Sequence, residues 1–152
     1  MVNVTEQIHT STLLKGLFKT RNLPAFLSQN EAAMQTLGFS DYITELCRQR
    51  ELVPERIVKQ SQIERTYGHQ LFNGTRKPSR DKVLQLAFGF GLNVEETQKL
   101  LRAAGKSQLY PKIKRDAVLI FCLSKQKSLF ESQDILSSLN LTLLGGDLRY
   151  GD

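Results

Sequence analysis

The chain has 152 residues, 40% of them hydrophobic and 24% charged, which is the composition of an ordinary globular protein. No apolar run approaches the roughly 18 residues of a membrane-spanning helix, and the N-terminus lacks the basic-then-apolar pattern of a signal peptide. We therefore expect a cytoplasmic protein with no membrane partner. Cys47 and Cys122 lie in apolar helical patterns and are interpreted as buried hydrophobes. With two histidines and no Cys-x-x-Cys pair, we expect no metal site and no cofactor.

The net charge of +6 is concentrated in the middle of the chain. Residues 48–115 hold 15 Lys and Arg against 6 Asp and Glu, whereas residues 1–47 carry a net −1 and residues 116–152 a net −2. A basic middle between nearly neutral ends indicates contact with a polyanion such as nucleic acid. The alternative is a lysine-rich surface that only keeps the protein in solution.

The first 38 residues predict a helical arm and a linker. Residues 1–11 are polar without a clear period and are expected to fray. Apolar positions repeat as one helical face between Thr12 and Lys19. A second short helix follows, with Asn22 as its cap and Pro24 in its first turn. Residues 28–38 are typical of a linker with at most one helical turn.

Five helices are predicted between Phe39 and Gly105. Ser40 is expected to cap the first, residues 41–51, and Pro54 to open the second, which ends near Gln60. After a turn at residues 61–63, a third helix runs from about Glu64 to Asn73. The fourth and fifth, residues 80–90 and 94–104, are expected to have Ser79 and Asn93 as caps and glycines as stops. Because no segment alternates long enough to be a strand, the fold class is all-α.

The sequence also repeats itself at a distance of 35 residues. Arg80-Asp81-x-Val83-Leu84 lies over Arg115-Asp116-x-Val118-Leu119, and Asn93 lies over Ser128, another helix cap. The helix pair at 80–104 therefore predicts a second antiparallel pair at about 115–139, stacked on the first. Chance likeness between two amphipathic hairpins is the alternative. Arg80 and Arg115 each stand beside an Asp and are interpreted as fixing hairpin geometry rather than touching DNA.

The segment FNGTRKPSRDKVLQLAFGFGL resembles the lambda-repressor/Cro class of helix-turn-helix proteins, the xenobiotic-response-element-like family of bacterial and phage regulators. In that resemblance a recognition helix ends in Asn-Gly, a basic loop follows, and Pro-Ser opens the next helix. RTYGHQLFNGTRKPSRDK, EETQKLLRAAG and LYPKIKRDA also resemble stand-alone bacterial proteins of this kind with a C-terminal helical extension. The likeness covers residues 39 to about 139. It implies a five-helix helix-turn-helix fold and a nucleoid-associated bacterial transcription regulator.

A recognition helix of this kind enters the major groove and reads base edges from its N-terminal residues and outer face. The base-contacting candidates on helix 64–73 are Arg65, Thr66, Tyr67, His69 and Gln70. The phosphate-contacting candidates flank or close that helix and are Arg56, Lys59, Asn73, Thr75, Arg76 and Lys77. For Tyr67 the alternative is a place in the core, and for Arg65 a solvated charge at a helix start.

Four positions depart from the family pattern. Gln62 stands where the turn glycine is usual, Val58 replaces a small residue, and Gly68 replaces an apolar one. Because residues 58 and 68 face each other in the motif, the last two departures look like an exchange of volume. Pro54 stands where the family often has a DNA-contacting Gln, so that contact is expected to be absent.

We predict four segments: an N-terminal arm (1–38), a helix-turn-helix DNA-binding domain (39–106), a helical hairpin packed on it (107–144) and a disordered tail (145–152). The leading hypothesis is sequence-specific binding of double-stranded DNA, with a homodimer on a two-fold site. The alternative is a protein-binding adaptor that keeps the helix-turn-helix shape and docks through residues 12–27. We expect no enzyme and no catalytic residues, because no phosphate loop, metal cluster or nucleophile elbow is present in the sequence.

Overall fold

The computed structural model describes residues 2–34 and 38–146, with side chains described from residue 10 onward. This part of the chain is entirely helical, with nine α-helices, one 3-10 helix and no strand, so the all-α prediction is confirmed. The chain divides into two compact units, residues 1–36 and residues 37–152. Among the described residues no helix combines the length and apolar character needed to cross a membrane.

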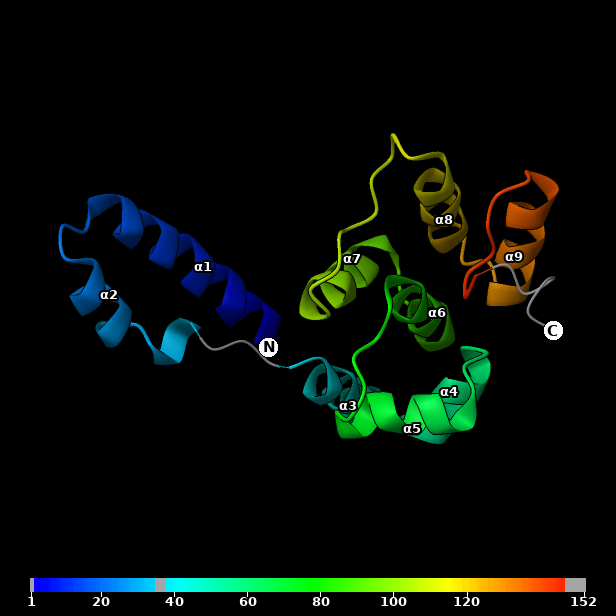
Figure 1. Cartoon of the computed structure of the whole chain (residues 1–152), viewed down its shortest axis with the longest axis horizontal. Helices are drawn as coiled ribbons and strands as arrows, with labels where there is room; N and C mark the ends of the chain where they lie inside the picture. The colour runs from blue at the N-terminus through cyan, green and yellow to red at the C-terminus, as the bar shows by residue number, and fades with distance from the viewer. Residues whose placement is uncertain (1, 35–37, 147–152) are drawn as a thin grey trace. The chain divides into compact units, whose positions relative to one another are not determined.

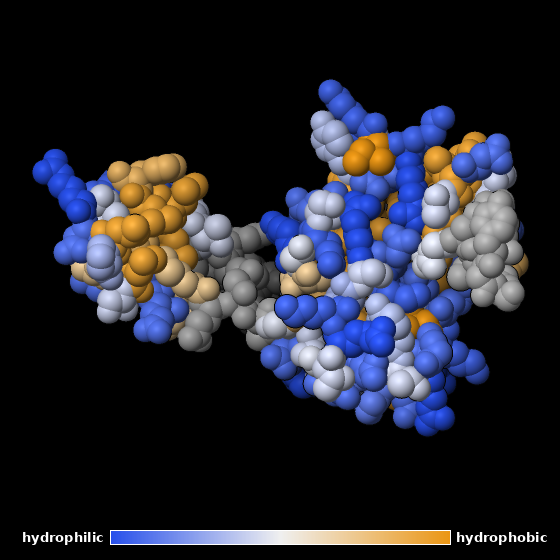
Figure 2. Space-filling view, in the orientation of Figure 1, coloured by the Kyte–Doolittle hydropathy of each residue, from blue (hydrophilic) through white to orange (hydrophobic). Residues whose placement is uncertain are grey.

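Unit 1 contains helices α1 (Val2–Lys19) and α2 (Leu23–Gln29) and a 3-10 turn, η1 (Ala32–Met34). The expectation of a frayed start over residues 1–11 is wrong, because α1 begins at Val2 and is continuous to Lys19. The predicted cap of α2 is confirmed: the Asn22 side chain accepts a hydrogen bond from the backbone N–H of Ala25 at 3.1 Å. Figure 2 shows apolar surface gathered over α1 and α2.

Unit 2 contains α3 (Phe39–Arg50), α4 (Pro54–Gln60), α5 (Arg65–Asn73), α6 (Arg80–Phe90), α7 (Val94–Ala103), α8 (Lys114–Ser124) and α9 (Leu129–Ser138). Helix α6 lies in the middle of this unit. It packs against α4, α7 and α9, while α5 packs against α3 and α4 (Figure 1). The core of unit 2 therefore surrounds α6, and five of its fully buried side chains belong to α6 and α7: Val83, Leu84, Leu86, Leu100 and Leu101.

The start of α3 differs from the prediction. The helix begins at Phe39, its cap position is Gly38, and no side chain caps it. Ser40 thus lies inside the first turn rather than before it. Its hydroxyl faces Gly74, where an added Cβ would come within 3.0 Å of the Ser40 Oγ atom. The Ser40 side chain thus packs against the residue that ends α5, and Gly38 takes the cap position of α3.

The predicted repeat at 35 residues is present as two helical hairpins, α6–α7 and α8–α9. Asn93 and Glu96 form a reciprocal capping box at the start of α7, and Ser128 and Glu131 form the same box at the start of α9. Gln98 exchanges two hydrogen bonds with the backbone of Leu109, at 2.7 and 2.9 Å. Thirty-five residues later, Gln133 does the same with Leu144, at 2.8 and 2.9 Å.

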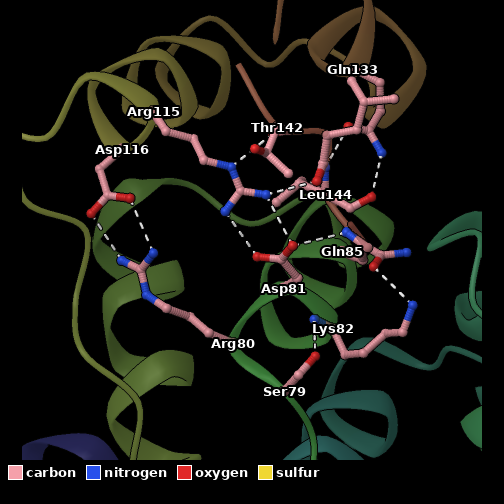
Figure 3. A network of polar contacts seen from close by, with 12 residues as sticks. Ser79, Arg80, Asp81, Lys82, Gln85, Arg115, Asp116, Gln133, Thr142 and Leu144 are labelled. Carbon is pink, nitrogen blue, oxygen red and sulfur yellow. Dashed lines mark hydrogen bonds and ion pairs between the residues drawn. The ribbon is translucent and has the colours of Figure 1, made fainter. Parts of the chain in front are cut away.

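The two hairpins pack against each other and are joined by reciprocal ion pairs (Figure 3). Arg80 of the first hairpin binds Asp116 of the second at 2.9 and 3.1 Å, and Arg115 of the second binds Asp81 of the first at 2.9 and 3.0 Å. Each guanidinium also donates to two backbone carbonyls of the loop that follows its own hairpin. Equivalent residues of the two hairpins thus bind each other's partners, which supports the expectation that Arg80 and Arg115 fix hairpin geometry.

The loop after α9 belongs to the same arrangement. The N–H of Gly145 donates to Asp81 at 3.0 Å, as the N–H of Tyr110 donates to Asp116 at 2.9 Å. Leu144, immediately before, is fully buried. Of the tail predicted for residues 145–152, the first two residues are therefore held on the second unit, and residues 147–152 lie outside the described part.

Candidate nucleic-acid interface

Helix α4 places one face in the core and leaves cationic side chains outside. Pro54 opens it at a position where a missing N–H costs nothing, as predicted. Ile57 and Val58 are buried in the core of unit 2, while Arg56 and Lys59 are exposed. The two predicted phosphate-contacting residues of this helix are thus accessible to solvent.

The connection from α4 to α5 is held in a single conformation by buried polar contacts. Ser61 is fully buried, and its hydroxyl donates to the carbonyl of Ile57 at 2.7 Å. The side-chain amide of Gln85 on α6 donates to the carbonyls of Ser61 at 3.0 Å and Gln62 at 3.3 Å. Gln62 has a φ of +55°, the left-handed conformation that favours glycine. The position where the resembled family has glycine therefore keeps a glycine-like backbone here.

Helix α5 begins at Arg65 with Glu64 as its cap. The Glu64 carboxylate accepts hydrogen bonds from the N–H groups of Thr66 and Tyr67. A carboxylate at this end is stabilised by the helix dipole. The sequence indicated that the helix starts near Glu64, but the capping role of its carboxylate appears only in the structure. Its consequence is a negative charge beside the predicted base-reading end.

The exchange of volume between Val58 and Gly68 is present in the structure. A Cβ added to Gly68 would lie 2.3 Å from Cγ1 and 2.6 Å from Cγ2 of Val58. The valine thus fills the space that a side chain at residue 68 would need, and α4 and α5 approach closely. A glycine inside a helix costs about 1 kcal/mol relative to alanine, and here the close packing offsets it.

The outer face of α5 carries the predicted base-contacting side chains. Arg65, Thr66 and His69 are exposed, and Gln70 is half-buried. Tyr67 is also half-buried, because its ring packs against the core of unit 2. The alternative of a place in the core thus describes part of the Tyr67 ring, and the other part meets cationic side chains of the same chain.

Arg76, in the loop after α5, is folded back onto the helix. Its Nε donates to Oε1 of Gln70 at 3.0 Å, and its guanidinium lies 4.4 Å from the centre of the Tyr67 ring. Lys82 of α6 approaches the same ring, with its ammonium 5.5 Å from the centre. Three residues predicted as separate contacts, Tyr67, Gln70 and Arg76, are therefore one cluster, which Lys82 joins. The sequence gave no signal for Lys82 beyond its place next to Asp81 at the start of α6.

Asn73 and Thr75 form the tight turn that ends α5. Oδ1 of Asn73 accepts from the N–H of Thr75 at 2.9 Å and from its hydroxyl at 2.7 Å. Gly74 between them has a φ of +84° and ends the helix as predicted. Both side chains shape the loop, and Lys77 follows them in an exposed position.

Every charged residue from the start of α5 to the start of α6 is positive. Residues 65–80 contain Arg65, Arg76, Lys77 and Arg80 and no Asp or Glu. Figure 2 shows hydrophilic side chains covering α4 and α5 at the lower end of unit 2. Such a surface suits an anionic partner whose own acceptors can be reached by hydrogen bonding.

The remaining candidates for chemistry in the described part of the chain are metal-binding groups, histidine and thiols. No group of three or more His, Cys, Asp or Glu is placed there to hold a metal ion. His69 is exposed on α5, as predicted. Cys47 and Cys122 are buried free thiols, and burial raises the pKa of the Cys47 thiol.

Comparison of the chain with models of protein families, with curated proteins and with solved structures finds no match in any of the three.

Proposed function

We propose that this chain binds double-stranded DNA in a sequence-specific way as a transcription regulator, with α4 and α5 acting as a helix-turn-helix of the lambda-repressor type. The observation that carries this proposal is the acid-free stretch of residues 65–80, which puts hydrogen-bonding and cationic side chains on the outer face of α5 and its following loop. The five helices α3–α7, with α4 and α5 joined by a short turn, agree with that motif.

In this proposal α5 lies in the major groove and α4 crosses the phosphate backbone. Arg65 would pair with guanine, and Thr66 and His69 would contact neighbouring base edges. Arg56, Lys59 and Lys77 would neutralise phosphates and fix the register. The Tyr67–Gln70–Arg76 cluster would present the Arg76 guanidinium in a pre-set orientation, which lowers the entropy lost on binding.

The test is fluorescence anisotropy of a labelled duplex of mixed sequence at a series of salt concentrations. Each neutralised phosphate contributes about −0.9 to the slope of log affinity against log salt. We expect the triple variant Arg65→Ala/Arg76→Ala/Lys77→Ala to flatten that slope by about 2 and to weaken binding by at least tenfold.

A matched control removes three positive charges elsewhere on unit 2. Arg102, Lys112 and Lys114 are exposed in the last turn of α7, in the loop after it and at the start of α8, and neither helix is among those that pack against α5. We expect Arg102→Ala/Lys112→Ala/Lys114→Ala to bind nearly as well as the natural chain. Equal losses in both triple variants would show that only net charge matters, and no binding by the natural chain at low salt would sink the proposal.

One observation favours a second candidate, a protein-binding adaptor that keeps the helix-turn-helix shape. Glu64 places a carboxylate at the end of α5 that would enter the groove, where phosphates and base acceptors repel it. This alternative predicts that Arg65→Ala and Gln70→Ala change no function of the protein. Selection of duplexes from a random pool separates the two, because an adaptor enriches no sequence.

A further inference from the structure

Unit 1 is a pair of helices held together at a very close contact. An added Cβ at Gly16 would lie 2.6 Å from Cε2 of Phe26, so the ring of Phe26 rests directly on the backbone of α1. This contact uses the one glycine of α1 and the one phenylalanine of α2. The packing of α1 against α2 therefore centres on this contact between Gly16 and Phe26.

That contact leaves most of the apolar side chains of unit 1 outside. Phe18 is 79% exposed, Leu23 52% and Leu14 51%, and Leu17 and Leu27 are exposed as well. Among residues 10–34, whose side chains are described, not one is buried. These side chains form the unit 1 apolar face, namely Leu14, Leu17, Phe18, Leu23 and Leu27 (Figure 2).

A unit of this size does not sustain itself on such a contact. Chains below about 40 residues usually need disulfides, a metal or association with another chain to stay folded. The two cysteines of the chain are at positions 47 and 122, outside unit 1, and its described residues include no metal-binding group. Association is the route that remains, and an exposed apolar face of this kind marks an interaction site.

The charges of unit 1 indicate what the partner is. Lys15, Lys19 and Arg21 lie around the turn between α1 and α2, and Glu31 lies beyond the other end of α2. A shallow depression lined by Leu27, Ser28, Glu31 and Met34 lies at that acidic end. The hairpin thus carries an apolar, cationic knob at one end and an apolar depression with a carboxylate at the other.

We propose that unit 1 is a self-association module in which the α1–α2 hairpins of two copies of this chain pair antiparallel. In this arrangement Phe18 of one copy enters the depression between Leu27 and Met34 of the other, and Arg21 meets Glu31. A two-fold axis makes both contacts twice, so one surface is complementary to itself. The proposal does not depend on DNA binding, although a dimer would present two α5 helices to a two-fold site.

The first experiment measures the mass of the full chain by sedimentation equilibrium between 1 and 100 µM. We expect the natural chain to dimerise and Leu14→Glu/Phe18→Glu to weaken association at least a hundredfold. The matched control is Phe130→Glu, which changes another highly exposed phenylalanine, 68% exposed, on α9 of unit 2. A natural chain that stays monomeric at 100 µM overturns the proposal, and so does a dimer that Phe130→Glu disrupts.

The second experiment tests the pairing itself and does not rely on a single variant folding well. Arg21→Glu alone and Glu31→Lys alone should each associate at least tenfold more weakly than the natural chain, because like charges then face each other. An equimolar mixture of the two should form a heterodimer, because both contacts regain opposite charges. A mixture that stays as weak as its components overturns the antiparallel arrangement. If Leu14→Glu/Phe18→Glu loses stability but keeps the mass of the natural dimer, association does not use the unit 1 apolar face, and the proposal is overturned.

Discussion

The hairpins α6–α7 and α8–α9 share a polar framework but stand in different surroundings. Their capping boxes, their glutamine bridges to the following loop and their Arg–Asp pairs coincide at a spacing of 35 residues. Leu86 of the first hairpin is fully buried, in a helix that packs against α4, whereas Phe121, at the same place in the second, is 49% exposed. The shape of a hairpin is therefore set by its caps and buried polar contacts, while its neighbours decide which apolar side chains become core.

The loops of the two hairpins show the same lesson in the backbone. Gly91 and Gly105 end the helices of the first hairpin with φ of +72° and +69°. Gln126 and Asn140, their equivalents in the second, have φ of +56° and +57°. Left-handed geometry at these positions is imposed by the hairpin, and the second hairpin adopts it with residues that have a Cβ.

The largest expected difference between the hairpins comes from truncating equivalent apolar residues. Leu86→Ala should lower the free energy of unfolding by about 3 kcal/mol, because it leaves a cavity in a packed core. Phe121→Ala should lower it by less than about 1 kcal/mol, because half of that side chain already meets solvent. Urea titration followed by circular dichroism measures both. Equal losses would mean that the exposed face of α8 is covered in solution.

The next largest difference is expected between the two ion pairs, which have similar distances but should contribute differently to the free energy of unfolding. The Asp116 side chain is 2% exposed and that of Asp81 is 23% exposed. Removing a buried partner leaves the other charge uncompensated, so Asp116→Ala should cost about 3 kcal/mol and Asp81→Ala about half of that. The same titration checks this, with Asp116→Asn as a control that keeps the shape. A larger loss at Asp81 would contradict the ranking by burial.

Acid should weaken the second of these pairs in a predictable direction. Burial is the largest single influence on Asp81 and raises its pKa, but the hydrogen bond and charge of Arg115 and the N–H groups of Gly145 and Gly146 together outweigh it, so the pKa of Asp81 is lowered. A lowered pKa in the folded state means that Asp81 stabilises the fold above about pH 4 and that this contribution disappears as pH falls through its folded pKa.

We therefore expect the difference in unfolding free energy between the natural chain and Asp81→Asn to be constant near neutral pH and to shrink below about pH 4. Unfolding titrations at pH 7, 5, 4 and 3 measure it. A difference that grows on acidification would show that the carboxylate does not carry the stabilisation. Phe130→Glu is the control, because it changes the carboxylate count of the chain at an exposed position of α9 and leaves Asp81 in place.

The smallest effects are expected at the left-handed positions. Gln126→Gly should raise the free energy of unfolding by about 0.5 kcal/mol, because relief of the left-handed strain slightly exceeds the entropy that glycine loses. Gly91→Ala, the reverse change in the first hairpin, should lower it by about 1 kcal/mol. No neighbouring atom lies within 4 Å of a Cβ at residue 91, so conformation alone is tested there. Thermal unfolding is precise enough, and a loss of stability in Gln126→Gly would refute the interpretation.

Several elements were predictable from the sequence because their determinants are local. Pro54, the caps Asn22, Ser79, Asn93 and Ser128, and the stops Gly74, Gly91 and Gly105 act within a few residues, and the structure has them where the sequence indicated. The cap at Ser40 was wrong because α3 begins at Phe39, two residues before the predicted start, with the extended residue Gly38 in the cap position. The start of α1 was wrong because polar residues without a period can still continue a helix.

The candidate interface was predictable as a set of residues but not as an arrangement. Exposure of Arg56, Lys59 and Arg65 followed from helix periodicity, and that of Lys77 from its place in the basic loop after α5. The cluster of Tyr67, Gln70, Arg76 and Lys82 joins a helix, a loop and the next helix, and no periodicity carries that information. Gln85 holds the α4–α5 turn from 23 residues away. Its position inside an apolar stretch of α6 was the only sign in the sequence.

The sequence by itself determined the all-helical class, most helix boundaries, the basic middle of the chain and the repeat at 35 residues, because propensity, capping and periodicity act along the chain. Only the tertiary structure decided that Arg80 pairs with Asp116 and Arg115 with Asp81, and that Gln62 adopts the backbone of a glycine. Each of these joins segments that meet only after the helices have packed, and packing sets which partner lies within reach.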